Sequence, residues 1–184
     1  GMYRLQEGPA GSGLGRSIPR VQLLGSGTIL REAIAAADLL WSEWGVAGDV
    51  WSVTSFTELR RDGIDVERWN LLHPGDKPRK AYVTQQLEKT VGPIVATTDY
   101  KRLFAEQIRP FLPRGRDYRV LGTDGFGRSD TRAKLREFFE VDRHYVVLSA
   151  LRALADEGML PVAKVAEAIK KYGIDPNKPN PATV

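Results

Sequence analysis

Residues 21–45 read VQLLGSGTILREAIAAADLLWSEWG, and their pattern decides the class of fold. The short apolar run at 21–24 is typical of a buried strand, and the Gly-Ser-Gly that follows it is typical of a tight turn. Beyond the turn, apolar residues recur every three or four positions, as they do along one face of a helix. Ser26 or Thr28 is expected to cap this helix, and Gly45 to end it. The stretch therefore predicts one βα unit.

The same order of strand and helix recurs along the chain. Ser55 and Glu58 form a capping box that opens a short helix, and a second helix is expected to start at Asp65. Asp99 is expected to cap the helix after the next strand. This alternation predicts a largely parallel sheet with helices on both faces. The further strand patterns are DVWSVTSF (49–56), GPIVATTD (92–99) and YRVLG (118–122).

Composition narrows the class of protein. A chain of 184 residues with 42% hydrophobic and 27% charged residues suits one globular domain, and no apolar run reaches the roughly 20 residues of a membrane helix. The net charge of +4 comes from scattered basic pairs, which argues against nucleic-acid binding. With no cysteine and two histidines, no disulfide framework or typical zinc site is expected. The absence of a basic-then-apolar leader favours a cytoplasmic protein.

Three regions are expected along the chain. Residues 1–20 include GPAGSGLGRSIPR, which is rich in glycine, proline and serine, and are predicted to be a linker or loop outside the core. Residues 21–175 are predicted to form a single α/β domain. Residues 176–184 are predicted to be an irregular, proline-rich tail.

Two glycine-rich stretches are weak candidates for a phosphate site. GSGLG at 11–15 follows no strand and opens no helix, so a flexible loop is expected. Gly25, Ser26, Gly27 and Thr28 lie between strand and helix, where exposed N–H groups and the helix dipole favour an anion. The dinucleotide fingerprint requires a glycine where Leu30 stands. The turn is therefore either a tight corner or a weak anion site.

A third glycine-rich stretch, LGTDGFGRSDTRAKL at 121–135, invites a cofactor interpretation. Its glycines run in the reverse order of the dinucleotide fingerprint. Thiamine diphosphate enzymes use Gly-Asp-Gly followed by distal asparagines, whereas here Thr123 precedes Asp124 and no asparagine occurs between Asp124 and Asn177. The pattern therefore excludes a diphosphate site in this chain.

Free-standing catalysis has little support in the sequence. His73 follows a helix pattern and precedes a proline, so it is either a general acid or substrate contact, or a helix-end residue bonded to the last carbonyls. His144 is expected to be an ordinary surface residue. The chain carries neither a G-x-S-x-G elbow nor a Walker loop.

Five stretches of the sequence, taken in chain order, closely resemble the C-terminal domain of the homodimeric pyruvate dehydrogenase E1 components of bacteria. The resemblance implies an α/β fold of the transketolase C-terminal-domain type, a three-layer α/β/α sandwich with a mainly parallel sheet of about five strands. Four strands are clear from the pattern, so the fifth is expected at 80–86 (KAYVTQQ) or in the weakly patterned ends. The stretches are VQLLGSGTILREA, DVWSVTSFTELRRDG, ERWNLLHP, TDYKRLFAEQIRPFLP and YRVLGTDGFGRSDTRAKLREFFEVD with YVVLSAL.

The resemblance also implies a reaction for the parent enzyme. Such enzymes decarboxylate pyruvate with thiamine diphosphate and Mg²⁺, and pass the acetyl unit to the lipoyl group of a dihydrolipoyl acyltransferase. Their cofactor-binding residues lie in other domains, so this chain alone is expected to hold neither cofactor and to be inactive. Its partners would be the other E1 domains, the second E1 subunit and the acyltransferase.

Within the resemblance, a structural and interface-forming role is expected for this domain. The residues expected near a domain or subunit interface, or the active-site mouth, are His73, Asp124, Phe126, Arg128 and Ser129. Two alternatives stay open. One is the same domain of another transketolase-like thiamine enzyme, and the other is a free-standing anion- or nucleotide-binding regulatory module that uses the turn at 25–28.

Overall fold

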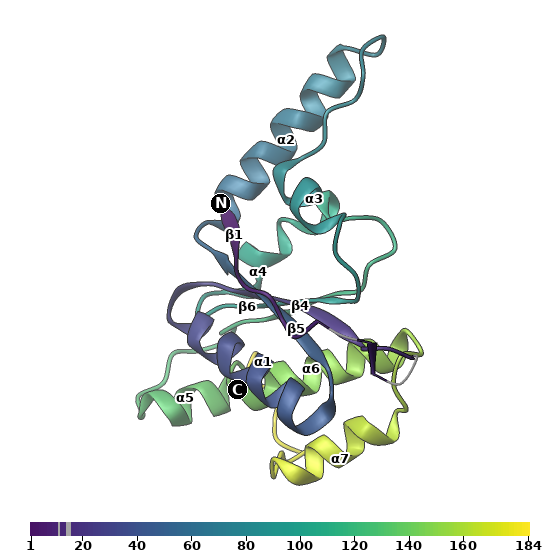
Figure 1. The fold of residues 1–184 in the computed structure, drawn as a ribbon. Helices are drawn as coiled ribbons and strands as arrows, with labels where there is room; N and C mark the ends of the chain where they lie inside the picture. Colours follow the sequence, from purple (N-terminus) through teal and green to yellow (C-terminus); the bar gives the residue numbers. More distant parts are fainter. Residues whose placement is uncertain (11, 14–15) are drawn as a thin grey trace.

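The computed structural model describes residues 1–10, 12–13 and 16–184 (Figure 1). In this part of the chain, five strands form one sheet in the order β1-β5-β4-β6-β7. Strands β4 to β7 run parallel, as the βα alternation predicts, and β1 is antiparallel to β5. The loop expected at 11–15 falls mostly outside the described residues. The strands are β1 (Met2–Gln6), β4 (Arg20–Gly25), β5 (Ala47–Val53), β6 (Ile94–Thr97) and β7 (Tyr118–Leu121), with a separate small pair of β2 (Ser12–Gly13) and β3 (Arg16–Ser17).

Helices cover both faces of the sheet, which confirms the three-layer α/β/α sandwich (Figure 1). One layer contains α1 (Leu30–Trp44) and α6 (Arg143–Asp156), with α5 (Arg132–Phe138) and α7 (Ala163–Lys171) beside them. The other contains α2 (Phe56–Leu72), α3 (Tyr82–Leu87) and α4 (Arg102–Glu106). Two single-turn helices, η1 (Gly27–Ile29) and η2 (Arg109–Phe111), precede α1 and follow α4. None of the helices in the described part of the chain is long and apolar enough to cross a membrane.

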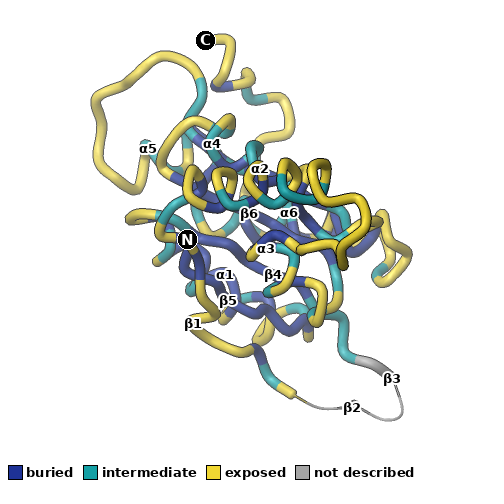
Figure 2. Tube along the Cα trace, turned by 90° about the horizontal axis from the view of Figure 1, so that it is seen from above, coloured by how far each residue is buried: buried dark blue, intermediate teal, exposed yellow. Residues whose placement is uncertain are grey.

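The core is divided by the sheet, because alternate strand residues point to opposite faces. Leu24 and Ala96 face the α2 side, and Leu23 and Val95 face the side of α1 and α6. All four side chains are fully buried. Figure 2 shows the central strands as buried, with most of the exposed chain in the outer turns and helix surfaces. Strands buried on both faces explain the near-continuous apolar runs in the sequence.

The fifth strand is β1, within the region that was expected to be a linker. The prediction of a linker or loop over 1–20 is therefore wrong for Met2–Gln6, and the alternative at 80–86 is also wrong because α3 lies there. Met2 pairs with Val53 and is buried, whereas the other four residues of β1 are exposed. An edge strand with one buried side chain leaves little hydrophobic pattern to recognise.

Helix α2 is continuous from Phe56 to Leu72, so the second start expected at Asp65 is wrong. The sequence suggests a break because Gly63 interrupts the helical pattern. In the structure, a Cβ atom at Gly63 would lie 2.5 Å from the ring of Phe111. The glycine therefore allows close packing of η2 against the helix and does not end it.

Candidate functional site

The loops after the parallel strands meet at the carboxyl edge of the sheet, as the topology predicts. The Ser26 N–H donates to the Thr97 carbonyl over 3.1 Å, and the Thr98 N–H donates to the Leu121 carbonyl over 3.1 Å. These bonds join the ends of β4, β6 and β7. The turn at 25–28 and the turn at 122–128, which are almost a hundred residues apart in sequence, thus lie on the same edge.

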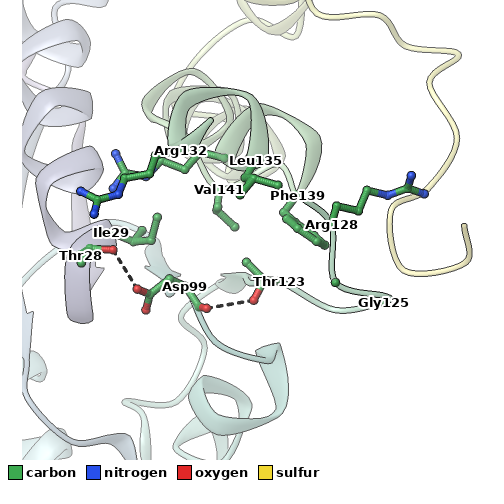
Figure 3. Close-up of a pocket in the computed structure, with 12 residues that line it drawn as sticks. Thr28, Ile29, Asp99, Thr123, Gly125, Arg128, Arg132, Leu135, Phe139 and Val141 are labelled. Carbon is green, nitrogen blue, oxygen red and sulfur yellow. Dashed lines mark hydrogen bonds between the residues drawn. The ribbon is translucent and has the colours of Figure 1, made fainter. Parts of the chain in front are cut away.

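Asp99 links the two turns (Figure 3). Its carboxylate accepts a hydrogen bond from the Thr28 hydroxyl over 2.8 Å, and its carbonyl accepts one from the Thr123 hydroxyl over 3.0 Å. Asp99 was expected to cap a helix, but the N-cap of α4 is Lys101 and has no side-chain cap bond. Ser26 and Thr28 do not cap either, because the Ser26 hydroxyl donates to Thr98 over 2.8 Å. Tertiary partners take the place of these predicted caps.

The Asp99 carboxylate also bears on the anion-site interpretation of Gly25, Ser26, Gly27 and Thr28. A Cβ atom built on Gly27 would lie 2.7 Å from the Asp99 Oδ1 atom, and Gly27 has a φ of 57° that favours glycine. A negative charge therefore lies directly beside the exposed end of the turn. Because a bound anion would face this carboxylate, the geometry favours the tight-corner interpretation.

A cavity of about 360 Å³ opens beside Asp99, between η1, α5 and the turn at 122–128 (Figure 3). Its wall combines the apolar side chains of Ile29, Leu135, Phe139 and Val141 with the polar groups of Asp99 and Thr123. Residues of the two glycine turns thus line one hollow, together with Arg128, Arg132 and Arg136.

Asp124 is engaged within the fold. Its carboxylate accepts a hydrogen bond from the Arg102 N–H over 3.2 Å and lies 3.5 Å from the Arg102 Nε atom. The part of the chain that the structure describes contains no group of three or more histidine, cysteine, aspartate or glutamate residues arranged to hold a metal ion. These residues do not fit the diphosphate and Mg²⁺ of a thiamine cofactor.

The turn at 122–128 presents its other predicted residues to solvent. Phe126 is 76% exposed, and Ser129 is also exposed. The Arg128 guanidinium lies 4.4 Å from the centre of the Phe138 ring, a cation–π distance. The inner side of the turn contacts the C-terminal tail, since a Cβ atom at Gly125 would lie 2.2 Å from the Pro181 carbonyl oxygen.

His73 is at the end of α2, well away from the turn that carries Phe126 (Figure 1). Its ring nitrogen Nδ1 lies 2.8 Å from the Trp69 carbonyl oxygen, and its ring stacks on Trp69 with centres 4.3 Å apart. His73 is therefore arranged as a helix-end residue bonded to one of the last carbonyls, and not as a general acid or substrate contact within this site. The structure therefore brings together Thr28, Asp99 and the 122–128 turn, and leaves His73 outside this site.

Glu32 is a buried charge beside the site that the sequence pattern does not reveal. Its carboxylate accepts hydrogen bonds from Arg136 Nη1 over 2.7 Å and from Arg143 Nε over 2.9 Å. Burial acts to raise the pKa of Glu32, but the hydrogen bonds and charges of Arg143, with the charge of Arg136, outweigh it and lower the pKa. No periodicity signals this cluster, because Glu32 and Arg136 lie 104 positions apart.

Comparison with known proteins supports the topology. Residues 1–142 match the family model described as "Transketolase-like TK C-terminal domain". The chain is 64% identical over 184 residues to the pyruvate dehydrogenase E1 component of Cupriavidus necator, covering 100% of this chain and 20% of that protein. It is 60% identical over 181 residues to the pyruvate dehydrogenase E1 component of Pseudomonas aeruginosa, covering 98% of this chain and 20% of that protein.

A solved structure shares the fold. The split gene transketolase, inactive beta4 tetramer, superposes with a TM-score of 0.53 at 18% identity, over 84% of this chain and 42% of that one. This likeness concerns the fold alone. The chain spans about one fifth of the length of the curated relatives that it matches. Since the family model covers most of its residues, the chain belongs to the transketolase-like TK C-terminal domain family.

Proposed function

We propose that this chain acts as the C-terminal domain of a pyruvate dehydrogenase E1 component, and that it supports assembly and not chemistry. The observation that carries the proposal is the 64% identity to such a component over all 184 residues. The carboxyl edge of the sheet supports a role in assembly, because its two carboxylates already have partners within the fold. The Asp99 carboxylate accepts a hydrogen bond from Thr28, and the Asp124 carboxylate accepts one from Arg102.

In the proposed parent enzyme, thiamine diphosphate and Mg²⁺ are held by the other domains, where they supply the chemistry of pyruvate decarboxylation. The acetyl unit then passes to the lipoyl group of a dihydrolipoyl acyltransferase. This chain alone is expected neither to bind the cofactor nor to turn over pyruvate. The proposal includes a cytoplasmic location and a homodimeric parent.

Exposed apolar side chains at the carboxyl edge are the structural basis for an interface. Tyr100, Leu103 and Phe126 are 60%, 65% and 76% exposed. Tyr100 lies in the loop after β6, Leu103 in the first turn of α4, and Phe126 in the turn after β7. Large aromatic side chains of this kind commonly dominate the binding energy of an interface. We infer that Phe126 contacts another domain or subunit of the parent enzyme.

Replacing Phe126 with aspartate in the full-length enzyme tests this role. We expect the dimer dissociation constant, measured by analytical ultracentrifugation, to rise about tenfold or more, because a buried aromatic anchor would become a charge. Thiamine-diphosphate-dependent acetyl transfer should fall in parallel at dilute enzyme. Val162→Asp is the matched control, since Val162 is an exposed apolar residue just before α7. An unchanged dimer at low micromolar concentration would count against a subunit interface at Phe126.

A further inference from the structure

The second half of α2 extends beyond the body of the domain (Figure 1). We call residues 64–80 the arm; they comprise the end of α2 and the segment that returns along it toward α3. Helix α2 has 17 residues, so it spans roughly 25 Å. Its first half packs Phe56 and Leu59 into the core, whereas every residue of the segment 71–80 is exposed.

The arm is held in shape by its own side chains. The Asn70 side chain donates to the Arg79 carbonyl over 3.0 Å and accepts from the Arg79 N–H over 2.8 Å. The Arg79 guanidinium lies 3.8 Å from the centre of the Trp69 ring, on which His73 also stacks. These contacts fasten the returning segment to the helix. A projection that is already folded loses little conformational entropy when it binds a partner.

The last two residues of α2 are apolar and exposed. Leu71 and Leu72 are adjacent and are 78% and 55% exposed, and Ile64 is 41% exposed nearer the base. Single exposed leucines are common on protein surfaces, but two neighbours at the end of a preformed projection form a contact element. Apolar residues without a local partner favour an occupant that is itself apolar.

The start of α2, half a helix before the arm, lies beside the first residue of the chain. The Gly1 carbonyl accepts hydrogen bonds from the N–H groups of Thr54 (2.9 Å) and Ser55 (3.1 Å), and Ser55 is the N-cap of α2. In the proposed parent enzyme, the polypeptide before this domain would therefore join it at the base of α2. A folded domain is wider than the roughly 25 Å between the base and the end of α2. The preceding domain can thus reach Leu71 and Leu72.

Resting on the function proposed above, we propose that the arm docks on the preceding part of the same E1 chain, with Leu71 and Leu72 entering a pocket of apolar side chains. The docked arm fixes the orientation of this domain relative to the domain before it. The surface at Phe126 is a separate contact.

Cysteine labelling of the full-length enzyme tests the docking. Leu71→Cys, Leu72→Cys and the control Val162→Cys are treated with a maleimide, and each peptide is quantified by mass spectrometry. In this domain Leu71 is more exposed than Val162, at 78% against 58%, so without docking position 71 would react at least as fast. We expect both arm positions to react about tenfold more slowly than position 162. Equal rates in a folded enzyme would overturn the proposal.

A photo-crosslinker, p-benzoylphenylalanine, at position 71 identifies the partner. A product that keeps the mass of one subunit, and links position 71 to a residue before this domain, supports docking within the chain. A product of twice that mass would overturn the same-chain assignment in favour of the second subunit. Pyruvate-dependent acetyl transfer is measured on each preparation. Its absence in the unmodified enzyme would contradict the proposed function, whereas an active enzyme with a reactive Cys at position 71 would contradict only the arm.

Discussion

At the scale of single residues, Glu32 shows how one buried charge can connect three helices. It lies on α1 and is 4% exposed, while Arg136 lies on α5 and Arg143 is the first residue of α6. The Arg143 backbone N–H also donates to the same carboxylate over 3.1 Å. Removing one member of such a charge cluster is destabilising, because the remaining charges are left without a partner.

We expect Glu32→Gln to lower the free energy of unfolding by about 2 kcal/mol at neutral pH, less than for a fully buried pair because both arginines still reach water. A lowered folded-state pKa gives stability that is present above the usual glutamate pKa, near 4.5, and is lost as pH falls through the folded pKa. Urea unfolding from pH 7 downward should therefore show the gap between the two proteins narrowing below about pH 4.5. A gap that widens in acid would contradict this.

At the scale of elements, α2 illustrates which local signals persist in the folded protein. The Ser55 hydroxyl accepts from the Glu58 N–H over 3.1 Å, so the predicted N-cap at Ser55 is confirmed. The reciprocal half of the capping box is not formed, because the Ser55 N–H donates to the Gly1 carbonyl. Gly63 makes room for the Phe111 ring and does not interrupt the helix. A cap depends on residues three positions apart, whereas the role of Gly63 depends on a residue far along the chain.

The cap makes a measurable contribution. Ser55→Ala should lower the free energy of unfolding by about 1 kcal/mol, because the first turn of α2 loses a hydrogen-bond acceptor. Ser42→Ala is the control: Ser42 lies inside α1, and its hydroxyl donates only to the Asp38 carbonyl one turn earlier over 2.8 Å. Denaturant unfolding of the two variants should therefore differ, and equal losses would contradict a specific capping role.

At the scale of the whole molecule, the C-terminal tail is part of the packed structure. Lys178 Nζ donates to the carbonyls of Glu137 (3.0 Å) and Phe138 (2.6 Å) at the end of α5. Pro181 is buried and packs against Gly125. The tail predicted for 176–184 is irregular in backbone, but it connects the end of α5 to the turn at 122–128.

Lys178→Met keeps an apolar stem and removes the hydrogen bonds to the two carbonyls. We expect a loss of about 1 kcal/mol in the free energy of unfolding. Hydrogen exchange at the amides of 122–128 should accelerate, because the tail that packs on Gly125 is loosened, while α1 should be unaffected. Lys170→Met, at an exposed position of α7, is the control and should leave both quantities unchanged. Unaltered exchange in the Lys178 variant would argue against this role of the tail.

The sequence predicts much of the fold and little of the site. Periodicity finds the four parallel strands, because β4, β5 and β6 are buried on both faces and read as apolar runs, and β7 keeps enough apolar residues to be recognised. It misses β1, where Met2 alone is buried. At the site, strand order predicts that the two glycine turns lie on one edge of the sheet. It does not predict the hydrogen bonds of Asp99 to Thr28 and Thr123. A polar side chain offers several local partners, and packing selects among them.

By itself, the sequence determined the βα order, the parallel sheet and the family resemblance, because these rest on local periodicity and on long runs of matching residues. Only the tertiary structure decided that Asp99 joins the two turns, that Glu32 gathers two arginines and that an arm carries Leu71 and Leu72 beyond the core. The physical reason is distance along the chain. Interactions among residues tens of positions apart exist only once the sheet has brought those residues together.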